Sequence, residues 1–310
     1  MMLSARNLSP PFVPWGKIAA LAALSAPPVL LAYALGMPHA AAVIGFATGF
    51  LATLAGGVTW AGAATLAAAL AYGLAILLPG EGYYITGLAL CALSLGSVRF
   101  GGGRAMTYSA VGWVFLTLYD FGSSPDHWAL GVFVIAALWA IPSAWWLGVS
   151  GLTAPKPPFV SVRAQIAVVI TAGFMATLML ADLIDMPRPY WVPFVFLHVV
   201  AATGLGATLP ALRRLLGAVL GVTAIAVFLP DGTPAAVMLI LAAVALTIAL
   251  RVLPAFPVVA RALTTAGILL VLLPTEDRIA DARLLAEILG TLVLCITTVL
   301  VWILSPSKTD

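Results

Sequence analysis

Apolar segments long enough to cross a lipid bilayer recur along almost the whole chain, and this recurrence limits the fold more than any other feature of the sequence. A helix needs about twenty apolar residues to span the hydrocarbon core. Turns containing Gly or Pro and isolated charges separate the segments. The predicted spans are twelve, at residues 16–35, 39–56, 58–78, 84–99, 105–119, 128–148, 163–183, 190–206, 213–229, 234–250, 257–273 and 283–304.

The balance of apolar and charged residues supports a membrane location. Of the 310 residues, 63% are hydrophobic and only 8% are charged, which is incompatible with a soluble domain of this length. The predicted fold class is therefore an all-α integral membrane protein. The net charge of +3 comes from scattered single residues, so nucleic acid is not an expected partner. Metal-ligand spacings and phosphate-binding loops are missing from the sequence, and we predict neither enzymatic activity nor a cofactor.

The distribution of basic residues predicts the orientation. With a cytoplasmic N-terminus, eleven of the fourteen Lys and Arg residues fall on the cytoplasmic side, and only Arg188, Arg278 and Arg283 fall outside. This asymmetry follows the positive-inside rule. Almost all acidic residues, Glu287 among them, fall in or near outer loops. Both termini of a multi-pass protein are therefore expected in the cytoplasm.

An internal repeat divides the predicted spans into two halves. Met37-Pro38 precedes the second span, and Leu78-Pro79 ends the following helix pair 41 residues later. In the second half, Met186-Pro187 and Leu229-Pro230 occupy the corresponding places, 43 residues apart. Because six spans per half is an even number, we expect parallel repeats related by a pseudo-two-fold axis along the membrane normal. The predicted domains are residues 1–150 and 163–310, joined by a Pro-rich linker at 151–162.

One stretch, residues 189–221, combines several membrane-protein signals. It begins with the aromatic pair Tyr190-Trp191, which is typical of a membrane interface, and later reaches the cytoplasmic pair Arg213-Arg214. Gly217 and Gly221 follow with a spacing of four residues, which indicates a helix face that approaches a neighbouring helix closely. The stretch is therefore expected to form an outside-to-inside helix followed by an inside-to-outside helix.

This stretch resembles the signature of the FUSC family, the fusaric-acid-resistance and aromatic-acid-exporter group of bacterial inner-membrane proteins, to which the plant aluminium-activated malate transporters are related. The matching elements are Tyr190-Trp191-Val192-Pro193, Gly206-Ala207-Thr208-Leu209 and Arg213-Arg214-Leu215-Leu216-Gly217. The chain departs from the pattern at residues 199–203, where the family often has a polar or charged group near the turn. The resemblance implies export of small organic anions from a bacterial cell across its inner membrane.

Ionisable residues inside predicted spans are the candidate substrate contacts. His198 lies near the middle of the eighth span, where its side chain could bind an anion when protonated or titrate during transport. A neutral histidine that is hydrogen-bonded to a neighbouring helix is equally consistent. Guanidinium groups suit carboxylates, and a set of arginines lies at the inner ends of several spans, although orientation alone also explains arginines there. The predicted substrate-binding residues are His198, Arg99, Arg251, Arg261, Arg213, Arg214, Tyr190, Trp191 and Thr203.

Proline residues interrupt two of the predicted spans. Pro27-Pro28 lies within the first span and Pro142 within the sixth, and each proline removes a backbone hydrogen bond and leaves a carbonyl oxygen free. Broken helices often line substrate sites in transporters. Kinked packing without a site is an equally common outcome.

These observations predict a gradient-driven exporter of small organic anions whose pathway runs between the two repeats. The preference for aromatic carboxylates is an implication of the family resemblance. A passive organic-anion channel and a non-transporting membrane scaffold are the alternatives. Expected partners are the anion and membrane lipid, with a periplasmic adaptor or a second copy of the chain as further candidates.

Overall fold

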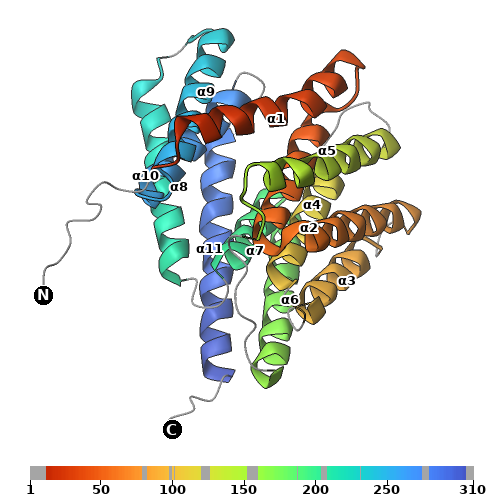
Figure 1. Ribbon diagram of the computed structural model, residues 1–310. Helices are drawn as coiled ribbons and strands as arrows, with labels where there is room; N and C mark the ends of the chain where they lie inside the picture. The colour runs from red at the N-terminus through yellow and green to blue at the C-terminus, as the bar shows by residue number, and fades with distance from the viewer. Residues whose placement is uncertain are drawn as a thin grey trace, which may run out of the picture. The chain divides into compact units, whose positions relative to one another are not determined.

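A computed structural model describes residues 12–78, 82–97, 100, 102–119, 126–151, 160–186, 188–203, 208–230, 232–273 and 279–304. Within these ranges the regular secondary structure consists of α-helices, as Figure 1 shows. They are α1 (Trp15–Ala34), α2 (His39–Leu77), α3 (Gly82–Ser97), α4 (Gly103–Leu118), α5 (Asp126–Trp146), α6 (Val160–Leu183), α7 (Trp191–Thr203), α8 (Thr208–Phe228), α9 (Ala235–Val252), α10 (Pro257–Leu272) and α11 (Ile279–Leu304).

The chain forms two compact units. The first unit takes Met1–Ala20 and Leu209–Ile288, and therefore contains the start of α1 together with α8, α9, α10 and the first part of α11. The second unit takes Leu21–Thr208 and Leu289–Asp310, with the remainder of α1, helices α2 to α7 and the remainder of α11. These units follow spatial contacts, whereas the predicted domains follow a sequence repeat. The division into two parallel repeats, and a pathway between them, stay predictions.

The helices begin and end close to the predicted spans, with one informative difference. Helix α2 covers two of the predicted spans, 39–56 and 58–78, and Gly57 lies between them. Gly57 has φ 79° and ψ −177°, a conformation that glycine adopts readily because it has no Cβ atom. The backbone is therefore non-helical at the position where the sequence predicted one span to end and the next to begin.

Five described helices contain apolar stretches long enough to cross a bilayer. These stretches are Trp15–Ala34, His39–Leu77, His127–Trp146, Ala235–Val252 and Ala280–Val301. Shorter apolar helices occur at Gly82–Ser94, Val169–Leu183 and Pro257–Val271. The all-helical character is therefore confirmed for the described residues, and the apolar helices agree with a multi-pass membrane protein. The count of twelve membrane spans stays a prediction.

Small residues let the helices of the second unit approach each other closely. A Cβ atom on Gly45 would lie 2.3 Å from the carbonyl oxygen of Phe133, and one on Gly49 would lie 2.4 Å from that of Ala137. The two glycines are four residues apart on α2 and face α5, which contributes further buried alanines. Lipid chains are as apolar as the helices, so tight packing of this kind is a main source of their association.

In the first unit, glycine residues likewise let α8 and α10 approach each other closely. A Cβ atom on Gly217 would lie 2.8 Å from the carbonyl oxygen of Val258, and one on Gly221 would lie 2.5 Å from that of Ala262. This confirms the prediction that Gly217 and Gly221 mark a close approach to a neighbouring helix. It also brings the basic start of α8 beside α10.

Replacing Gly49 by Ala should destabilise the protein, because the added methyl group meets backbone atoms of α5 that cannot rotate away. Overpacking of this kind costs about 1–3 kcal/mol. Gly62 on the same helix has no atom within 4 Å of the Cβ position, so Gly62→Ala is the matched control. It should leave stability unchanged or raise it, since Ala has a higher helix propensity than Gly. Thermal unfolding midpoints in one detergent would compare the two variants, and equal midpoints would contradict the packing described here.

Candidate functional site

Four charged side chains meet in the interior of the first unit. Arg214 comes from α8, Arg261 from α10, and both Arg283 and Glu287 come from α11. The side chain of Glu287 is completely buried, and the exposed fractions of Arg214, Arg261 and Arg283 are 6%, 15% and 1%. We call these four residues the arginine cluster.

The carboxylate of Glu287 accepts hydrogen bonds from all three guanidinium groups. Arg214 binds it with two donors: Nε lies 2.9 Å from Oε2 and Nη2 lies 3.2 Å from Oε1. Nη2 of Arg261 and Nη2 of Arg283 each lie 2.6 Å from Oε1. Such charge-assisted bonds are the strong class of hydrogen bond, and two-donor binding by Arg also selects for the planar carboxylate.

The charges in the arginine cluster do not balance. Three guanidinium groups and one carboxylate give a net charge of +2 when all four are ionised. Burying a charge is costly unless a partner compensates it, and the cost is greatest away from water. The arginine cluster is therefore suited to hold a further anion.

The local sequence explains how each member reaches the arginine cluster. Arg283 and Glu287 are four residues apart, so they lie on the same face of α11. Arg214 is buried while its neighbour Arg213 is exposed, because consecutive helical residues point about 100° apart. Gly217 leaves room for Arg261: a Cβ atom on Gly217 would lie 2.6 Å from Cβ of Arg261.

The arginine cluster corrects the predicted sorting of charges between membrane faces. The sequence placed Arg214 and Arg261 at the cytoplasmic side, and Arg283 and Glu287 at the outer side. Direct contacts at 2.6–3.2 Å exclude that separation, because the hydrocarbon core is roughly 30 Å thick. The prediction assigned these residues to membrane faces as if they lay in loops. It is wrong here because their side chains lie on helices and point into the protein. The cytoplasmic location of the termini stays a prediction.

Two members of the arginine cluster were not among the predicted site residues. Arg283 and Glu287 were assigned to an outer loop and the adjoining helix end. A usable signal was present, since an Arg and a Glu at a spacing of four residues fall within the predicted span 283–304. Ionisable residues inside a membrane helix are candidates for function by default.

The other predicted arginines have different surroundings. Arg251, at the end of α9, contacts the N-terminal segment: its Nη1 donates to the carbonyl oxygen of Val13 at 3.2 Å. Its guanidinium carbon also lies 4.4 Å from the ring centre of Trp15 and 5.4 Å from that of Phe12. These cation–π contacts give Arg251 a structural role in holding this segment. Arg99 lies outside the described residues.

The aromatic pair at the start of α7 is buried. Tyr190 and Trp191 are only 3% and 4% exposed, and the ring of Tyr190 lies 5.1 Å from that of Phe115 on α4. Arg188 donates a hydrogen bond to the hydroxyl of Tyr190 at 3.2 Å. Aromatic packing inside the second unit therefore covers the ring of Tyr190. The location of the pair at a membrane interface, and its role in substrate binding, stay predictions.

The remaining predicted contacts also belong to the second unit. His198 on α7 is half-buried, with its ring centre 5.5 Å from that of Phe194. Thr203 is the last residue of α7. A substrate-binding role for either residue stays a prediction.

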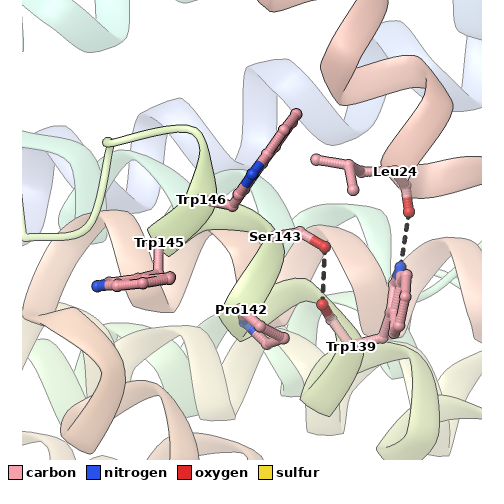
Figure 2. Close-up of a pocket in the computed structure, with 6 residues that line it drawn as sticks. All are labelled: Leu24, Trp139, Pro142, Ser143, Trp145 and Trp146. Carbon is pink, nitrogen blue, oxygen red and sulfur yellow. Dashed lines mark hydrogen bonds between the residues drawn. The ribbon is translucent and has the colours of Figure 1, made fainter.

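Leu24 of α1 and Pro142 of α5 line a pocket in the second unit, which Figure 2 shows. In α1, Pro28 has no N–H group to offer the carbonyl oxygen of Leu24, four residues earlier. The indole Nε1 of Trp139 donates to that oxygen instead, at 2.8 Å. The pocket has a volume of ≈ 350 Å³ and is lined by Leu24, Trp139, Pro142, Ser143, Trp145 and Trp146. Since no lining residue is charged, the pocket does not resemble a carboxylate site.

We expect Trp139→Phe to destabilise the protein by about 0.5–1.5 kcal/mol, because the carbonyl oxygen of Leu24 loses its donor. The same substitution should cost much less in a Pro28→Ala background, where the restored backbone N–H can bind that oxygen. Trp145→Phe, in the same pocket, is the control for loss of indole area. A double-mutant cycle based on unfolding free energies measures the coupling, and additive effects would disprove it.

Glu287→Gln should strongly destabilise the first unit, since three guanidinium groups would then face a neutral amide. Breaking a buried ion pair by removing one partner costs about 3–5 kcal/mol. Asp281→Asn removes the same charge from an exposed position on α11 and should cost less than about 1 kcal/mol. Unfolding in mixed micelles would compare them. Similar losses for both variants would show that the arginine cluster does not depend on its carboxylate.

Comparison with known proteins identifies a family that matches the part of the chain containing the arginine cluster. Residues 174–301 match the family described as Fusaric acid resistance protein-like. All four members of the arginine cluster fall within the matched residues. Searches of curated proteins and of solved structures found no match. The family indicates efflux or transport across a membrane in general, and the apolar helices agree with a multi-pass membrane protein. Over residues 174–301 the resemblance to the FUSC family, first inferred from the stretch around Tyr190 and Arg214, is confirmed.

Proposed function

We propose that this protein exports small organic anions across the bacterial inner membrane, and that the arginine cluster binds their carboxylate group. The observation that supports this function is the net charge of +2 in the buried arginine cluster. A transporter of neutral or cationic substrates would have no use for buried excess positive charge. An anion, by contrast, is attracted before it loses its water.

The geometry of the arginine cluster also favours carboxylates over other anions. Its guanidinium groups already bind one carboxylate, that of Glu287, through a two-donor contact and two further bonds. Planar carboxylates match the fork of guanidinium donors. The preference for an aromatic acid rests on the family's description, because fusaric acid is an aromatic carboxylic acid.

Arg261 is the member of the arginine cluster best suited to meet the substrate. It is the most exposed of the three arginines, at 15%, whereas Arg214 and Arg283 are more deeply buried. Arg261 is therefore the arginine of the arginine cluster that an entering anion can contact most readily. Replacing Arg261 is also less hazardous for folding than replacing the other two.

Transport in proteoliposomes tests this function. Arg261→Gln should raise the KM for benzoate by roughly ten- to a hundredfold, because it removes a charge-assisted bond worth about 1.5–3 kcal/mol. Arg261→Lys should recover only part of the loss, since an ammonium group lacks the planar fork. Lys17→Gln removes one charge from an exposed position and should transport like the wild type.

The same preparation separates the alternatives. Flux that depends on a proton gradient supports an exporter. Unitary currents would instead show that the protein is a passive anion channel. A wild-type protein that moves no carboxylate under any gradient would favour the scaffold. Wild-type KM in Arg261→Gln would remove the arginine cluster from the transport site.

A further inference from the structure

Two buried polar atoms on α10 lack a hydrogen-bond partner among the described residues. They are Nε of Arg261 and the hydroxyl oxygen Oγ1 of Thr265. Thr265 is completely buried, and most of the Arg261 side chain is buried as well. Each such atom has lost its hydrogen bonds to water without replacement, which is costly. Two of them on one helix suggest that a ligand supplies the missing partner.

The two groups share the face of α10 that meets α8. They are four residues apart, and a helical side chain leans toward the N-terminus, so Thr265 lies over the turn that carries Arg261. Contacts with α8 agree with this placement. A Cβ atom on Gly217 would lie 2.6 Å from Cβ of Arg261, and one on Gly221 would lie 2.9 Å from Cβ of Thr265. Both side chains therefore leave α10 on the side where the arginine cluster lies.

The chemistry of the two groups fits an acceptor with negative charge. The Nε atom of arginine carries a hydrogen that can only be donated, and the threonine hydroxyl can donate one too. A carboxylate has two oxygens that can accept from both. One carboxylate bound here would lower the net charge of the arginine cluster from +2 to +1.

We infer that Arg261 Nε and the Thr265 hydroxyl bind the carboxylate of an external monocarboxylic acid beside Glu287. Glu287 itself stays bound to Arg214 and Arg283. This inference rests on the proposed function and adds to it a residue, Thr265, whose part is to position the anion. It also means that the substrate joins the internal carboxylate and does not have to displace it.

Thr265→Val tests the inference, because valine keeps the shape of threonine and carries a methyl group in place of the hydroxyl. Since that hydroxyl has no partner to lose, the thermal unfolding midpoint without ligand should be unchanged or higher. The affinity for benzoate, measured by calorimetry on the purified protein, should fall about tenfold. Thr264→Val is the matched control: the hydroxyl of Thr264 donates to the carbonyl oxygen of Ala260 at 2.8 Å, and benzoate affinity should stay at the wild-type value.

The outcomes separate this inference from the proposed function. Wild-type benzoate affinity in Thr265→Val would overturn the inference, while weakened binding in Arg261→Gln would still support the arginine cluster. A lower unfolding midpoint in ligand-free Thr265→Val would show a structural hydrogen bond and would also overturn it. A wild-type protein that neither binds nor transports benzoate or acetate would contradict both.

Discussion

The carboxylate of Glu287 binds guanidinium groups from α8, α10 and α11, and through them it links three helices of the first unit. Without that negative charge, Arg214, Arg261 and Arg283 would repel one another in surroundings of low dielectric constant, where such repulsion is strong. The same carboxylate neutralises only one of three positive charges. Structural support and the proposed affinity for an anion therefore come from the same set of atoms.

The positions of the helices followed from the sequence because apolar length decides where a membrane helix can begin and end. Even the interruption of α2 at Gly57 was visible, since the glycine pair there separated two apolar stretches. The close approach of Gly217 and Gly221, on α8, to a neighbouring helix was also predictable from their spacing. How the helices group in space was not, because nearly every face of such a helix is apolar and the sequence pattern does not mark the one that meets a neighbour.

The arginine cluster was predicted only in part. Arg214 and Arg261 were identified as candidate anion contacts, but their partners Arg283 and Glu287 were assigned to the opposite membrane face. The positive-inside rule counts charges near helix ends, and it does not distinguish an orientation signal from a side chain that points into the protein. The burial of Tyr190 and Trp191 was not predictable for a related reason, because exposed and buried aromatic residues look alike in a sequence.

The order in which the arginine cluster is synthesised has a consequence for how the protein enters the membrane. Arg214 precedes Glu287 by 73 residues and Arg261 precedes it by 26, so α8 and α10 leave the ribosome before their counter-charge exists. Helix α11 differs, since Arg283 and Glu287 emerge together as a pair on one helical face. A nascent chain that has not yet reached α11 therefore presents two arginines on apolar helices with the partnering carboxylate still to come. Insertion of α11 is the step that completes this unit, and a chain interrupted before residue 279 would be a natural target for membrane quality control.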